Sequence, residues 1–157
     1  MTGFRRGVRL GIDVGRARIG VSRSDPDGML AVPVETVPRD DAAIARITAI
    51  AAEYEPLEIV VGLPVNLQGV DTASTVDARD FAAAILAANG TPVRLVDERL
   101  STVTAHAALR SSGRTQKNSR SIVDQVAAVV LLQQAIDMEK STGNPPGSTI
   151  PLDEESP

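Results

Sequence analysis

Three carboxylates stand in stretches whose other residues are mostly apolar, and they are the residues that could do chemistry. Asp13 lies within the run VRLGIDVG, Glu98 closes the run VRLVDE, and Asp124 lies within SIVDQVAAVVLL. Carboxylates that converge repel one another and stay ionised when a cation shares their site. Oxygen ligands without histidine or cysteine suit Mg²⁺ or Mn²⁺, and such ions can activate a water for phosphodiester hydrolysis.

Each carboxylate also has an interpretation without chemistry. Asp13 could lie on the solvent face of a half-buried strand, and Glu98 could pair with Arg99. Ser121 and Asp124 have the spacing of a capping box, in which a carboxylate satisfies the first backbone N–H groups of a helix. Asp97 and Glu98 face opposite sides of a strand, so only one of them can join a cluster. We choose Glu98, in part for its longer reach, and the turn that follows leaves this choice open by one residue.

The elements that must position these acids follow from the apolar periodicity of the chain. Alternating or continuous apolar runs predict strands, and stripes at helical spacing predict helices. The strands are expected at residues 8–14, 20–24, 29–37, 59–63 and 93–98, and the helices at about 40–54, 74–88, 102–111 and 121–138. Short links make the first three strands antiparallel, and helical connections make the later strands parallel to the first. The predicted fold class is therefore α/β, with a mixed five-stranded sheet flanked by helices on both faces.

Length and composition predict one soluble globular domain. The chain has 157 residues, of which 43% are hydrophobic and 23% charged, and no run is long enough for a membrane span. Cysteine is absent, which excludes disulfides and thiolate sites, and a cytoplasmic location is the default expectation. The stretch from Ser141 is rich in proline, serine and acidic residues, so we expect a domain over residues 1–140 and a disordered tail over 141–157.

Charge is unevenly distributed, although the net charge is only -4. Basic residues gather in the first 23 positions, where Arg16 and Arg18 follow Asp13, and again before the last helix, where Arg114, Lys117 and Arg120 lie. Clustered cations fit a polyanionic partner such as nucleic acid, but a solvated mixed-charge surface explains them equally well. With three aromatic residues in the chain, base stacking is not expected to be the main contact.

Four ordered motifs resemble the YqgF/RuvX family. They are GIDVGRARIGVS, VVGLPVNLQG, VDERLST and SIVDQVAAVVLL, and together they span roughly Val8 to Gln134. The resemblance implies an RNase H-like fold and a nuclease of Holliday junction resolution or of pre-16S rRNA maturation. It also implies that Asp13, Glu98 and Asp124 are the catalytic residues and the ligands of Mg²⁺ or Mn²⁺.

The resemblance further implies a set of contacts to nucleic acid. The expected nucleic-acid-binding residues are Arg16, Arg18, Asn66, Arg114, Lys117 and Arg120. The substrate would be structured RNA or branched DNA, and no membrane partner is expected. Binding to ribosomal precursor particles and formation of a homodimer stay open.

We therefore expect a metal-dependent nuclease that processes pre-16S rRNA in ribosome biogenesis. The alternatives are a Holliday junction resolvase acting in DNA recombination and repair, and a non-catalytic nucleic-acid-binding or ribosome-assembly factor on the same fold. An actin-like phosphotransferase also places Asp and Gly after its first strand, but it needs a second lobe for which this chain has no room.

Overall fold

The computed structural model describes residues 4–65, 68–97 and 116–150, with the backbone alone over residues 116–123. Its strands are β1 (Arg9–Val14), β2 (Arg18–Ser24), β3 (Ala31–Pro38), β4 (Glu58–Leu63), β5 (Val93–Asp97) and β6 (Ser148–Thr149). Its helices are α1 (Ala43–Tyr54), α2 (Ala73–Asn89) and α4 (Gln116–Thr142). The strands form one sheet in the order β3-β2-β1-β4-β5-β6.

The strand directions confirm the predicted topology. β2 pairs antiparallel with both β1 and β3, whereas β4 pairs parallel with β1 and with β5. β3 lies at the edge of the sheet, where its prolines cost no ladder hydrogen bonds. The carboxyl ends of β1, β4 and β5 therefore lie along the same edge of the sheet, which is where ligands bind in α/β proteins.

The sheet has a sixth strand that the sequence did not predict. β6 pairs antiparallel with β5, the N–H of Ile150 donates to the carbonyl of Val93 (3.0 Å), and Nη1 of Arg94 donates to the carbonyl of Pro146 (3.3 Å). These bonds attach this part of the expected disordered tail to the sheet. The segment covers the edge that β5 would otherwise expose. Residues 151–157 lie outside the described residues.

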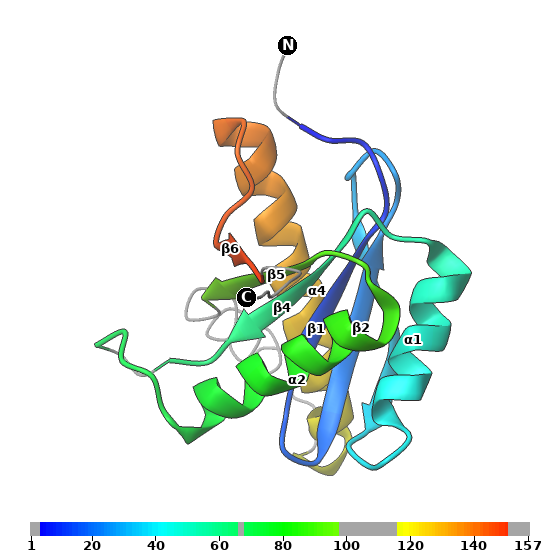
Figure 1. The fold of residues 1–157 in the computed structure, drawn as a ribbon, viewed down its shortest axis with the longest axis vertical. Helices are drawn as coiled ribbons and strands as arrows, with labels where there is room; N and C mark the ends of the chain where they lie inside the picture. The colour runs from blue at the N-terminus through cyan, green and yellow to red at the C-terminus, as the bar shows by residue number, and fades with distance from the viewer. Residues whose placement is uncertain (1–3, 66–67, 98–115, 151–157) are drawn as a thin grey trace, which may run out of the picture.

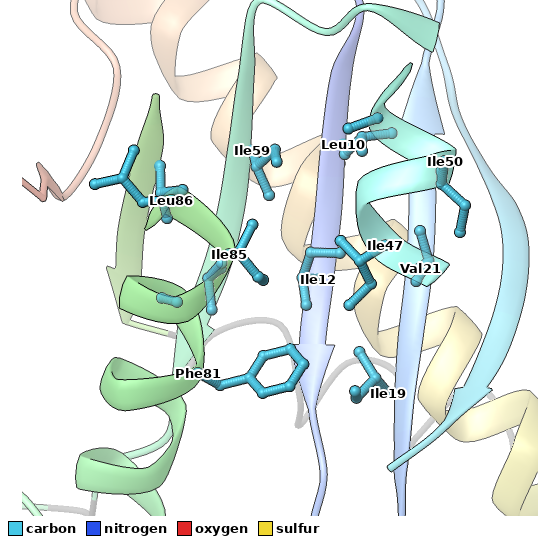
Figure 2. Packing of buried hydrophobic residues seen from close by; sticks show 14 of the residues in the cluster. Leu10, Ile12, Ile19, Val21, Ile47, Ile50, Ile59, Phe81, Ile85 and Leu86 are labelled. Atoms are coloured by element: carbon cyan, nitrogen blue, oxygen red, sulfur yellow. The ribbon is translucent and has the colours of Figure 1, made fainter. Parts of the chain in front are cut away.

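The helices cover both faces of the sheet, as predicted. Figure 1 shows α1 and α2 in front of the sheet and α4 behind it. Side chains from β1, β2 and β4 meet those of α1 and α2 in the larger apolar core (Figure 2). That core is built mainly of Ile, Leu and Val, with Phe81 as its fully packed aromatic residue.

The helix boundaries differ most from the prediction in α4. This helix begins at Gln116, so Asp124 lies about two turns inside it and the capping-box interpretation is wrong. The stretch QKNS is polar but contains no proline or glycine, so a helix can extend through it without an apolar stripe. The helix expected at 102–111 lies outside the described residues. No helix in the described part of the chain is both long and apolar enough to cross a membrane.

A buried ionic cluster ties the start of the chain to the end of α4. Glu139 is 2% exposed and accepts from Arg5 (2.8 Å) and Arg9 (3.1 Å), while Glu58 accepts from Arg5 and Arg94 (both 3.1 Å). Burial alone would raise the pKa of Glu139, but the hydrogen bonds from Arg5 and the charge of Arg9 lower that pKa to about 2. The cluster joins β1, β4, β5 and α4 at the amino ends of the parallel strands, opposite the edge where the acids were expected.

Candidate active site

Asp13 lies on the face of the sheet that carries α4. Leu10 and Ile12 point into the core beneath α1 and α2, so the alternate residues Gly11 and Asp13 lie on the other face. Gly11 confirms this, because a Cβ there would lie 2.8 Å from Cβ of Leu132 in α4. Asp13 is half-buried, next to the last residue of β1. The aspartate that interrupts the apolar strand therefore lies at the carboxyl edge of the sheet.

Gly20 brings Asp124 to the same place. Gly20 is the cross-strand partner of Asp13 in β2, and the backbone of α4 passes directly over it. A Cβ on Gly20 would overlap the carbonyl group of Asp124 and lie 3.1 Å from the backbone nitrogen of Gln125. The close crossing is possible only because residue 20 has no side chain. Asp13 and Asp124, 111 positions apart, are thus neighbours across one glycine.

Polar contacts fix α4 at this crossing. The hydroxyl of Ser22 donates to the carbonyl of Ala128 (2.8 Å), and Nε2 of Gln125 donates to Oγ1 of Thr36 (2.8 Å). Further along, Oε1 of Gln133 accepts from the backbone N–H at the start of β3 (2.8 Å). These bonds join the helix to β2 and β3 at three successive levels, so the position of Asp124 relative to the sheet is well defined.

Arg18 is the partner of Asp124. Its Nε donates to Oδ2 of Asp124 at 2.8 Å, and the Asp124 side chain is 16% exposed. From the sequence, Arg18 was expected to bind nucleic acid, and nothing in the local pattern pointed to a residue 106 positions away. The structure therefore places a cation beside one of the expected acids, at the start of β2.

Arg16 is exposed on the turn between β1 and β2. It lines a cavity of about 460 Å³ together with Arg39, Ala73 and Asp77. Arg39 and Asp77 form a bidentate ion pair (2.9 and 2.8 Å) that the sequence did not reveal, because its members lie far apart in the chain. Hydrogen bonds from Arg39 lower the pKa of Asp77 against the effect of burial, and the charge of Arg16 adds to this.

The other expected site residues lie wholly or partly outside the described part of the chain. Asn66, Glu98 and Arg114 lie outside the described residues, and Lys117 and Arg120 belong to the first turns of α4, where only the backbone is described. Asp97, the alternative to Glu98, is the last residue of β5 and is exposed. Within residues 4–65, 68–97 and 124–150, no three acidic or histidine side chains gather closely enough to hold a metal ion.

Comparison with models of known protein families identifies the family of this chain. The model of the RuvX family, described as Holliday junction resolvases, matches residues 7–138. The chain belongs to the RuvX family. Its four sequence motifs and the two acids on either side of Gly20 all fall within the matched range.

Several curated proteins are similar in sequence to this RuvX chain over almost the whole length of both chains. A protein of Leifsonia xyli subsp. xyli is 58% identical over 94% of this chain and 96% of its own, and one of Clavibacter michiganensis subsp. michiganensis is 54% identical over 98% of both. A third, from Streptomyces coelicolor, is 52% identical over 94% of this chain and 90% of its own. All three carry the name "Putative pre-16S rRNA nuclease".

The fold has a counterpart among solved structures. The chain of Thermus thermophilus RuvC in complex with a Holliday junction substrate matches with a TM-score of 0.60 and 16% identity, over 91% of this chain and 99% of that one. This likeness confirms the RNase H-like fold expected from the sequence, with β6 as an additional strand.

The donor atoms of the RuvX site fit a hard divalent cation. Asp13 and Asp124 offer carboxylate oxygens on one face of the sheet, and the chain contains no cysteine that would favour a softer metal. The largely buried Asp124 side chain also has a cationic partner in Arg18, as buried acidic groups commonly do.

Proposed function

We propose that this RuvX protein is a divalent-metal-dependent nuclease that hydrolyses phosphodiester bonds in structured nucleic acid, with pre-16S rRNA as its substrate. The observation that carries the proposal is that the α4 backbone crosses Gly20 at Asp124, and that Gly20 is the cross-strand partner of Asp13 near the carboxyl end of β1. The names of the relatives, which align over nearly the full length of the chain, favour the RNA substrate.

Glu98 is proposed as the third acid. In β5, Val93 and Leu95 point into the core beneath α1 and α2, whereas Val96 packs among residues of α4. The same alternation places Asp97, the last described residue of β5, on the face of Val93 and Leu95, opposite to that of Asp13. The strand pattern therefore supports Glu98 rather than Asp97 as the ligand that joins Asp13 and Asp124.

The chain's own residues would bind and orient the substrate. Asp13, Glu98 and Asp124 would hold Mg²⁺ or Mn²⁺, which would supply activation of a water and stabilisation of the charge on the cleaved phosphate. Arg18 would hold the Asp124 carboxylate in one orientation. Arg16, exposed on the turn beside Asp13, would contact a phosphate of the substrate backbone.

Further basic and polar residues complete the proposed interface. Lys117 and Arg120 lie one to two turns before Asp124 in the same helix, and they are proposed to contact phosphates of the substrate. Asn66 and Arg114 are proposed as additional contacts, on the family resemblance alone. Ribosomal precursor particles in the cytoplasm are the proposed setting, and a homodimer would present two such interfaces.

A Holliday junction resolvase is the second candidate function. The description of the family model favours it, and the same acids would cut DNA by the same chemistry. The two candidate functions use the same catalytic groups. They differ in the nucleic acid that the proposed contact residues, such as Arg16, Lys117 and Arg120, would bind.

The experiment offers the purified chain a pre-16S rRNA fragment with its flanking sequences, a four-way DNA junction and a linear duplex of equal length. Mg²⁺, Mn²⁺ and a chelator are compared in each case. Metal-dependent cleavage of the RNA at least tenfold faster than of the junction supports the proposal, and the reverse preference supports the resolvase. Binding to either substrate without cleavage would instead identify a non-catalytic factor.

A further inference from the structure

The turn between β1 and β2 is short and carries a functional residue on each side. Asp13 precedes it by one residue, and Arg18, the partner of Asp124, begins the strand that follows it. The turn closes on itself by a hydrogen bond from the N–H of Gly15 to the carbonyl of Arg18 (2.9 Å). Any tilt of this turn would therefore move Asp13 and Arg18 together relative to α4.

Arg39, which lies outside the turn, donates hydrogen bonds to two carbonyl groups of the turn. The backbone N–H of Arg39 donates to the carbonyl of Ala17 (3.0 Å), and its Nη1 donates to the carbonyl of Gly15 (2.9 Å). Arg39 follows the last residue of β3, so its backbone is fixed by the sheet. The side chain reaches back over the turn and binds it from the side opposite to α4.

Arg39 is itself held in one orientation. Its two terminal nitrogens donate to the two carboxylate oxygens of Asp77 in α2 (2.9 and 2.8 Å), and its guanidinium lies 4.6 Å from the ring centre of Phe81. Phe81 is 7% exposed and belongs to the main core. A bidentate charge-assisted pair and a stacked ring leave the guanidinium little rotational freedom.

We propose that Arg39 is a positioning residue of the RuvX active site: it fastens the β1–β2 turn to α2 and so sets where Asp13 and Arg18 stand relative to Asp124. The proposal rests on the proposed nuclease function. Asp77 is 42% exposed, so the ion pair contributes little to global stability, and its value lies in fixing the turn.

The structure offers a matched control for Arg39. Arg46 in α1 forms a bidentate pair with Glu35 in β3 (2.8 and 2.6 Å), and this pair touches neither the turn nor α4 in the contacts described. Arg46→Ala removes an ion pair of the same geometry from the same face of the sheet. It therefore reports the cost of losing such a pair without moving the turn.

The experiment compares wild type, Arg39→Ala, Asp77→Asn, the double variant and Arg46→Ala. Steady-state cleavage with substrate in excess gives kcat and KM, calorimetry with Mn²⁺ alone gives metal affinity, and thermal unfolding gives Tm. We expect Arg39→Ala to lower kcat at least tenfold with KM unchanged within twofold, and to weaken Mn²⁺ binding several-fold. Asp77→Asn should act in the same direction, and the double variant should be no worse than Arg39→Ala, since both changes release the same contact.

Arg46→Ala should leave kcat and Mn²⁺ affinity unchanged. The proposal is overturned if Arg39→Ala keeps wild-type kcat and Mn²⁺ affinity, or if Arg46→Ala loses as much of both. Failure of the nuclease function is a separate result: wild type would cleave no substrate. In that case the Mn²⁺ affinity of Arg39→Ala, measured without nucleic acid, still decides whether Arg39 positions the acids.

Discussion

Replacing Gly20 by alanine should displace Asp124. The cleavage rate should fall strongly, while most of the protein stays folded. The added Cβ would sit at least about 1 Å inside van der Waals contact with the carbonyl of Asp124, and 3.1 Å from the nitrogen of Gln125. These are backbone atoms of a helix, so they cannot rotate away as a side chain could. The helix must shift away from β2 at the position of the proposed metal ligand.

The expected magnitudes follow from the size of that shift. Overpacking of this kind costs about 1–3 kcal/mol of unfolding free energy. A domain of ordinary stability would still be more than roughly 90% folded after such a loss. A displacement of about 1 Å between catalytic groups can reduce the rate about 100-fold. Cleavage by Gly20→Ala should therefore fall by about that factor while most of the protein stays folded.

Gly11→Ala provides the comparison. A Cβ there would lie 2.5 Å from Oγ of Ser22, 2.8 Å from Cβ of Leu132 and 2.9 Å from the carbonyl of Ala128. It strains the same interface one turn or more further along α4, so it should destabilise the protein similarly but reduce cleavage less than about tenfold. The assays are urea unfolding and single-turnover cleavage of the same substrate. The reasoning is refuted if Gly20→Ala cleaves at the wild-type rate, or if both variants lose activity in proportion to stability.

Three further predictions concern the ionic cluster around Glu139, the segment that contains β6, and Arg16 as a contact to nucleic acid. Glu139→Gln should lower the free energy of unfolding by ~3 kcal/mol at pH 7, because the folded-state pKa of about 2 lies below the ordinary glutamate pKa of 4.5. A depressed carboxyl pKa stabilises above the unfolded pKa, so urea titrations should show the difference fading as the pH falls from 4.5 towards 2. Glu53→Gln, in the exposed part of α1, is the control. Deleting residues 143–157 should cost about 2 kcal/mol in the same assay, since it removes β6 and its bonds to β5; unchanged stability would mean that the strand contributes nothing. Arg16→Glu should weaken nucleic-acid binding and reduce the slope of log affinity against log salt by about 1, measured by fluorescence anisotropy, whereas an unchanged slope would exclude a phosphate contact.

The topology could be predicted because it depends on local patterns. Apolar alternation located the first strand, the continuous run ending at Leu63 marked a strand buried on both faces, and the link lengths fixed the strand directions. β6 could not be predicted, because two polar residues carry no periodicity and pair only when β5 is already in place. The start of α4 was missed for a related reason, since its first turns have no apolar stripe.

The candidate site was predictable only in part. An aspartate inside an apolar strand is unusual enough to stand out, so Asp13 could be named as a candidate from its place in the sequence, although the strand alone did not exclude a solvent-facing position. The partnership of Arg18 with Asp124 and the hold of Arg39 on the β1–β2 turn depend on tertiary packing between distant residues. Gly20 lies between these two cases, since its lack of a side chain indicates a close approach without saying what approaches.

The measurement that tests the central claim most directly is cleavage of the pre-16S rRNA fragment by wild type, Asp13→Asn and Asp71→Asn purified identically, with Mg²⁺ and with Mn²⁺. Asp71 is an exposed acid paired with Arg79 (2.9 Å), and it is not one of the three proposed metal ligands. If Asp13 holds the metal, Asp13→Asn should lose cleavage about 100-fold or more and Asp71→Asn should match wild type. Equal cleavage by wild type and Asp13→Asn would contradict the account, because the carboxylate within β1 would then have no part in the reaction.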